Sequence, residues 1–140
     1  MKKIFFIFGI IILFFPGCSN KEEVKLTTAG SNAIAMNMGS GWEVTALTEL
    51  SGFAQDEKDK IFTAKIFYSV DVLTKDGKTL RSIFTNQIDK NEKESISSLK
   101  IEAQFNIGQD YSTGKYKAVF NIKDLISNKT TKDTVGFNLD

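Results

Sequence analysis

Much of the chain after residue 41 alternates between core-type and solvent-type side chains at every second position. Successive side chains of a β-strand point to opposite faces, so this period of two predicts strands that each bury one face. Four predicted core-facing sets are clearest: Trp42, Val44, Ala46, Thr48 and Leu50; Phe62, Ala64, Ile66, Tyr68, Val70 and Val72; Leu99, Ile101, Ala103, Phe105 and Ile107; and Tyr116, Ala118, Phe120 and Ile122.

Polar or glycine-containing segments separate these predicted strands. Asp76-Gly77 favours a tight hairpin, because both residues tolerate a positive φ. The segment 79–88 alternates less cleanly, as an edge strand does, and Val135, Phe137 and Leu139 mark a last strand. The predicted turns and loops are Gln55–Lys60, Lys75–Lys78, Asp89–Glu94, Gly108–Gly114 and Ser127–Thr130.

The pattern therefore predicts an all-β domain of six or seven strands over residues 42–140. No sustained 3.6-residue apolar period is found after the leader, and no internal repeat is evident. A two-sheet antiparallel sandwich is the simplest way to bury one face of every strand, and a small barrel is the alternative closure.

Residues 18–41 are interpreted as a flexible tether. The segment is rich in Ser, Asn, Lys, Thr and Gly and lacks helical apolar spacing. An alternative stays open for Ala33–Met38, where Ile34, Met36 and Met38 alternate with smaller residues and predict a short first strand.

The first seventeen residues have the charge order of a secretory signal peptide. Lys2 and Lys3 precede a twelve-residue run, Ile4–Phe15, in which only Gly9 is not strongly apolar. As a helix this run is about 18 Å long at ~1.5 Å per residue. It is too short for a bilayer core of about 30 Å, so it is predicted to be a leader and not a membrane span.

Phe15-Pro16-Gly17-Cys18 resembles the lipobox of bacterial lipoproteins, in which a small residue precedes an acylated cysteine. The resemblance implies cleavage after residue 17, lipid attachment at Cys18 and anchoring in a bacterial cell envelope. Ser19, where an aspartate often signals inner-membrane retention, favours the outer membrane in a double-membraned cell. The alternatives are ordinary signal-peptide cleavage near Gly17 and an uncleaved membrane anchor.

Gly114-Lys115-Tyr116-Lys117-Ala118 resembles the start of strand F in immunoglobulin-like domains. The resemblance implies an immunoglobulin-like sandwich in which Tyr116 is a corner tyrosine, bonded through its hydroxyl to a nearby backbone group. Ala118 then stands where antibody domains carry a cysteine.

The amino-acid composition limits which ligands and catalytic groups the protein is expected to have. Without Lys2 and Lys3, sixteen basic residues oppose seventeen acidic ones, for a net charge of −1. Nucleic-acid binding is not expected at this balance, because phosphate contacts need a concentrated basic face. The absence of histidine removes the commonest general base and metal ligand, and a single cysteine cannot form an intrachain disulfide. No catalytic residue, metal site or cofactor is predicted.

Four aromatic residues lie off the main alternation or in turns and form the candidate binding surface: Phe53, Phe67, Phe84 and Tyr111. Exposed together, they would mark a partner site. The alternative is that they complete the inner face of the second sheet or a loop cluster. A second candidate is the basic stripe of Lys115, Lys117 and Lys123 on one strand face, which otherwise serves solubility.

The function predicted from these features is a lipid-anchored, non-catalytic module that binds another envelope component. A protease inhibitor that presents the loops Gln55–Lys60 and Asp89–Glu94 is the first alternative. A small-ligand carrier or hydrolase is the second, and it requires a concave pocket with converging polar groups.

Overall fold

The computed structural model describes residues 24–140, and the predicted leader and Cys18 lie outside that range. Within it the chain forms eight β-strands and no helix. The strands are β1 (Thr27–Asn37), β2 (Gly41–Ser51), β3 (Asp56–Lys58), β4 (Ile61–Leu73), β5 (Thr79–Glu92), β6 (Ser98–Gly108), β7 (Gly114–Asp124) and β8 (Thr130–Leu139).

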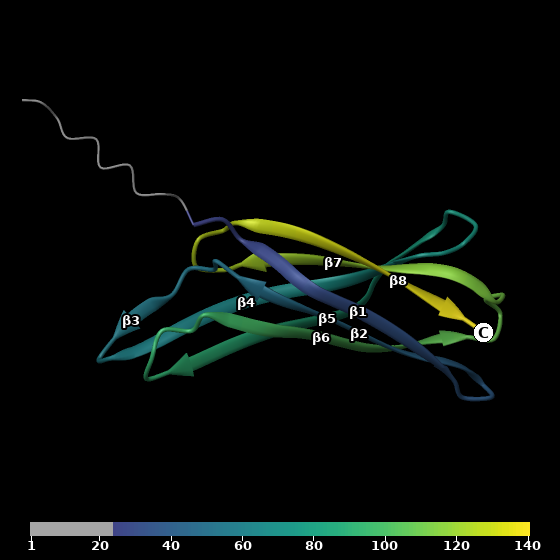
Figure 1. The fold of residues 1–140 in the computed structure, drawn as a ribbon, viewed down its shortest axis with the longest axis horizontal. Coiled ribbons are helices and arrows are strands. Elements are labelled where there is room, and N and C mark those ends of the chain that lie inside the picture. Colours follow the sequence, from purple (N-terminus) through teal and green to yellow (C-terminus); the bar gives the residue numbers. More distant parts are fainter. Residues whose placement is uncertain (1–23) are drawn as a thin grey trace, which may run out of the picture.

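The strands form two antiparallel sheets that face each other as a sandwich (Figure 1). One sheet has the order β1-β2-β6, and we call it the A sheet. In the B sheet, β4 pairs with β5 along one side and with β7 along the other, and β8 pairs with β7. The short strand β3 pairs with the first residues of β4, before the β7 ladder begins at Ile66.

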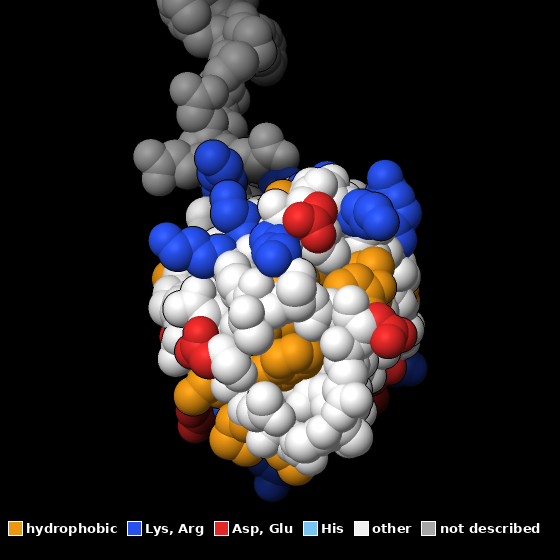
Figure 2. Space-filling model, turned by 90° about the vertical axis from the view of Figure 1, so that its right-hand side faces the viewer, with side chains coloured by type: hydrophobic (Ala, Val, Ile, Leu, Met, Phe, Trp, Pro, Cys, Tyr) orange, Lys and Arg blue, Asp and Glu red, His pale blue; other side chains and the backbone are white. Residues whose placement is uncertain are grey.

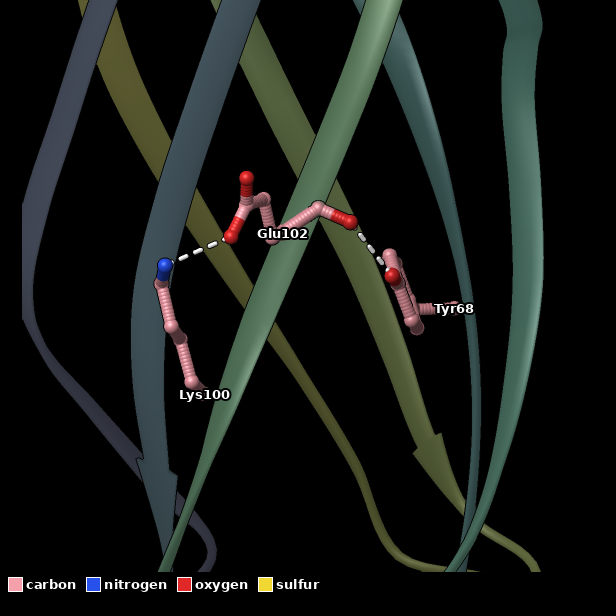
Figure 3. A network of polar contacts seen from close by, with 3 residues as sticks. All are labelled: Tyr68, Lys100 and Glu102. Carbon is pink, nitrogen blue, oxygen red and sulfur yellow. Dashed lines mark hydrogen bonds and ion pairs between the residues drawn. The ribbon is translucent and has the colours of Figure 1, made fainter.

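The core lies between the sheets and contains the residues that the period of two assigned to it. Val44, Ala64, Ile101 and Phe120 are each fully buried, and they come from β2, β4, β6 and β7. Tyr68 crosses the core from the B sheet, where its hydroxyl donates to the backbone oxygen of Glu102 on β6 at 2.5 Å (Figure 3). All-β architecture and the two-sheet sandwich are thus confirmed.

Side chains join β1 to β8 at the margin between the two sheets. The hydroxyls of Ser31 and Thr48 both donate to the carboxylate of Asp133 on β8, the latter at 2.6 Å. A register shift in the β1–β2 ladder, between Ala29 and Asn32, accompanies the inward turn of Ser31. Thr48 is the one polar member of its predicted core-facing set, and these hydrogen bonds explain its burial.

The tether predicted over residues 18–41 is wrong for residues 27–37, which form β1. The strand alternative for Ala33–Met38 is correct in kind, but β1 begins six residues earlier, at Thr27, and ends one residue earlier, at Asn37. The polar composition of β1 led to the wrong prediction, because few of its large side chains face the core. The segment is a strand because its backbone pairs with β2. The domain therefore starts well before residue 42.

Two segments predicted as loops contain strand residues. Gln55–Lys60 contains β3, and most of Asp89–Glu94 belongs to β5, which continues to Glu92. Both strands pair with β4, whose length lets it bind β3 and the far part of β5 at one end. The structure therefore has eight strands, where six or seven were predicted.

The Tyr116 hydroxyl donates to the backbone oxygen of Ser112, four residues upstream, at 2.7 Å. This is the contact expected of a corner tyrosine at the start of β7. The immunoglobulin-like label for the whole domain stays a prediction.

Candidate functional site

The four aromatic residues predicted to form a binding surface do not lie together on the surface. Phe53 is buried in the core after β2, and Phe84 on β5 packs its ring 6.0 Å from that of Tyr68. Tyr111, in the turn before β7, is partly buried against the core. Only Phe67 is exposed, with 39% of its surface accessible.

Phe67 lies on the outer face of the B sheet, directly opposite Lys123 of β7 in the ladder. A hollow of about 560 Å³ adjoins it, lined by Ser69, Asn121, Lys123, Thr130 and Lys132 among others. Its floor is a sheet surface with one aromatic ring, hydroxyl and amide groups, and two lysines at the border. Such an arrangement can bind an anionic, partly apolar surface.

Lysines are concentrated on this outer face. Lys65, Lys123 and Lys132 are exposed around Phe67, and Lys115 and Lys117 extend the row toward the other end of β7. The predicted stripe of Lys115, Lys117 and Lys123 is therefore one exposed strand face. Figure 2 shows Lys and Arg side chains gathered on the upper part of the end view, the side on which β7 and β8 lie in Figure 1.

A second exposed feature is an apolar stripe on the outer face of β1 and the adjoining hairpin. Ile34, Met36 and Met38 follow one another at every second position, and 60%, 53% and 58% of their surfaces are accessible. Together with Val24 and Phe67, they are the exposed large hydrophobic residues of the described range. We call Ile34, Met36 and Met38 the β1 stripe.

The sequence showed that large and small residues alternate in β1, but not which of them face the core. Large residues normally face the core, yet here the small residues Ala33 and Ala35 pack against it and the larger ones face solvent. Ser31 of β1 is bonded to Asp133 of β8, and this close approach leaves little depth for large inward side chains. Only the fold could therefore identify the β1 stripe as a surface.

One fully buried carboxylate, that of Asp124, serves the fold. Asp124 is fully buried and accepts hydrogen bonds from the Ala54 backbone at 2.7 Å and the Ser127 hydroxyl at 2.6 Å. Burial alone raises the pKa of Asp124, but these hydrogen bonds outweigh it, and the pKa lies below its ordinary value. The bond from Ala54 joins the end of β7 to the segment after β2, and the bond from Ser127 closes the β7–β8 turn itself, so both carboxylate oxygens serve the fold.

Residues 24–140 contain no group of three or more acidic, histidine or cysteine side chains placed to hold a metal ion. The carboxylate of Asp71 accepts from the backbone of Ser82 at 2.7 Å and from the side-chain amide of Asn121 at 3.0 Å. In the same range no helix has the length and apolar character needed to cross a membrane.

No protein-family model matches the chain, and no curated protein does. Among solved structures, the chain is similar in fold to part of a family 123 glycoside hydrolase from Clostridium perfringens, with a TM-score of 0.49 and 9% sequence identity. The match covers 76% of this chain and 22% of the hydrolase chain, so the chain spans less than a quarter of that enzyme.

Proposed function

We propose that this protein is a lipid-anchored, non-catalytic binding module of a bacterial cell envelope. The leader and the cysteine at position 18 support the anchor. The pairing order of the two sheets and the hydrogen bond between Tyr116 and Ser112 support an immunoglobulin-like sandwich as the module.

The β1 stripe is the observation that carries the binding role. Three neighbouring apolar side chains that are each more than half exposed are unusual on a free surface, and such patches mark interaction sites. Methionine suits a contact surface, because its unbranched side chain adapts to the partner's shape. Glu43 lies opposite Met36, and Thr45 lies opposite Ile34, so a polar border follows the stripe along β2.

The stripe also lies far from the point where the anchored chain enters the domain. β1 begins at Thr27, and its ten residue steps to Asn37 cover about 33 Å at ~3.3 Å per residue. An anchor that precedes Val24 therefore leaves the stripe at the distant end, accessible to another envelope protein. We propose that this partner has a complementary apolar surface.

A photo-crosslinking amino acid at position 36 of the full-length protein tests the partner in living cells. A defined partner should crosslink from position 36 but not from position 100, since Lys100 is exposed on the same outer face but lies six residues, about 20 Å, along β6 from the level of Met36. The triple variant Ile34→Ser, Met36→Ser, Met38→Ser should abolish binding of the purified partner without unfolding the domain. Equal crosslinking from both positions would overturn the stripe as the interface.

The anchor has its own test. Mass spectrometry of the mature amino terminus should show acyl chains on residue 18, and Cys18→Ser should release the protein from membranes. An unmodified thiol at that position in the native protein would contradict the anchor while leaving the crosslinking result unaffected.

A further inference from the structure

We infer that the face formed by Lys65, Lys123 and Lys132 around Phe67 docks against anionic lipid headgroups of the membrane that holds the anchor. This inference rests on the proposed acylation of Cys18. It goes beyond that proposal by assigning an orientation to the domain and a ligand to its basic face.

The length of chain before the domain is the first argument. Six residue steps separate Cys18 from Val24, the first described residue. Even fully extended, six steps span at most about 20 Å. The tether predicted from sequence was four times longer, and β1 removes most of it. A lipid at Cys18 therefore holds the domain within a short distance of the headgroups.

The entry point of the chain adjoins the basic face. The Lys129 ammonium donates to the backbone oxygen of Val24 at 3.1 Å, which places the entry beside the β7–β8 turn. Thr130 and Thr131 line both the hollow next to Lys25 and the hollow next to Phe67. The part of the domain nearest the anchor is thus the part that carries Lys123 and Lys132.

Charge complementarity is the second argument. The ion pairs found between described residues join Lys90 with Glu92 and Lys100 with Glu102, and none includes Lys65, Lys123 or Lys132. Asp89 lies opposite Lys65 and offsets part of its charge, but the residues opposite Lys123 and Lys132 in the ladders are uncharged. Lysines held near an anionic leaflet are attracted to it, each by about fivefold in binding constant.

Apolar exposure supports the same surface. Phe67 lies among the three lysines, and Val24, with 66% of its surface accessible, precedes Lys25 at the entry point. Aromatic and aliphatic side chains beside basic ones are typical of peptides that lie in the headgroup region. Docking on this face directs the β1–β2 hairpin and its stripe away from the membrane surface.

The test uses the full, acylated protein in vesicles of phosphatidylcholine, alone or mixed with phosphatidylglycerol. Thr130→Cys, on the face, carries a polarity-sensitive dye, and Gln104→Cys carries it on the opposite sheet. We expect the dye at position 130 to shift toward an apolar spectrum only in vesicles with phosphatidylglycerol, while the dye at position 104 stays water-like. High salt should reverse the shift, because screening weakens these attractions.

The matched variants remove the same charge from opposite ends of the domain. Lys65→Gln, Lys123→Gln, Lys132→Gln should lower the docked-to-undocked ratio by about a hundredfold, since each lysine near the leaflet contributes about fivefold. Lys75→Gln, Lys78→Gln, Arg81→Gln, at exposed positions in and beside the β4–β5 hairpin, should leave the ratio nearly unchanged. Thermal unfolding of both triple variants checks that the domain stays folded.

The outcomes separate the two proposals. A protein that stays on the vesicles but gives the same spectrum in both lipid mixtures overturns the docking and leaves the anchor standing. Equal effects of the two triple variants also overturn it, since general charge would then explain the attraction. If the native protein is found to carry no acyl groups and does not sediment with vesicles, both the anchor and the docking are overturned.

Discussion

The hydroxyl of Tyr68 on β4 donates a hydrogen bond to the backbone oxygen of Glu102 on β6, across the interior of the sandwich, at 2.5 Å (Figure 3). β6 is an end strand of the A sheet and pairs with β2 alone. Its outer backbone groups lack a strand partner, so Tyr68 satisfies one of them from the opposite sheet. The same hydroxyl accepts from the Asn86 amide at 3.3 Å.

Tyr68→Phe should therefore lower the free energy of unfolding by about 1–3 kcal/mol, because a carbonyl group facing the interior loses its donor. Tyr111→Phe is the matched control. Tyr111 is partly buried, but its hydroxyl forms no hydrogen bond with another described residue, and we expect a change below about 0.5 kcal/mol. Urea unfolding at constant pH measures both, and equal losses would contradict the role of the Glu102 bond.

Asp133 predicts an acid-sensitive junction between β1, β2 and β8. Burial alone raises the pKa of its carboxyl, but donation from Ser31 and Thr48 outweighs this and holds the pKa below the ordinary 3.8. A group with a lowered folded-state pKa adds stability that is complete above its unfolded-state pKa and is lost as the pH falls through the folded value. Stability should thus be level near pH 7 and fall on acidification below about pH 4.

Asp133→Asn should make the fall in the free energy of unfolding with decreasing pH less steep, because the amide does not titrate. Urea unfolding of both proteins across the acid range gives the difference in slope. Asp110→Asn serves as the control, since Asp110 is exposed and accepts no hydrogen bond from another described residue. A variant at position 133 with an unchanged pH profile would show that the junction does not sense acid.

How far the sequence predicts this fold depends on where each strand lies. Strands β2, β4, β6 and β7 have both a solvent face and a core face, and their period of two is correct almost residue by residue. The contact between Tyr116 and Ser112 was also predictable, because it depends on residues four positions apart. Strand periodicity and contacts between residues close in the chain can therefore be predicted directly from the sequence.

The parts of the structure that were predicted wrongly depend on contacts between residues far apart in the sequence. β1 is a strand because it pairs with β2 and bonds to β8, and its own composition resembles a linker. Phe53 and Phe84 were predicted to be exposed, but they pack in or against the core, where residues distant in the chain cover them. Of the predicted aromatic surface only Phe67 is exposed, and its lysine neighbours come from β4, β7 and β8 together.

Asp124 joins the end of β7 to the segment after β2. Its oxygens accept from the backbone of Ala54, from the backbone and hydroxyl of Ser127, and from the backbone of Ile126 at 2.9 Å. Asp124→Ala leaves these donors unsatisfied, so we expect a loss of about 3 kcal/mol or more in the free energy of unfolding. Asp124→Asn should lose less, since it keeps an acceptor oxygen. Denaturant midpoints measure both, and a fully stable alanine variant would contradict the role.

Gly52, directly after β2, packs against the backbone of Lys25. Even its substitution by alanine is therefore expected to lower the stability of the domain strongly. Its φ is +76°, and a Cβ atom added there would lie 2.1 Å from the backbone oxygen of Lys25. A side chain thus meets both backbone strain and a clash with backbone that cannot rotate away. Gly52→Ala should destabilise the domain by at least about 2 kcal/mol.

Gly108→Ala is the matched control, because a Cβ atom at Gly108 meets nothing within 4 Å. Thermal unfolding should separate the two variants clearly. If the domain yields at Gly52 by releasing the Lys25 segment and not by unfolding, amide hydrogen exchange should rise from Lys25 into the first residues of β1 while the β4–β7 ladder stays protected. Unchanged exchange and stability together would contradict the close packing of Gly52 against Lys25.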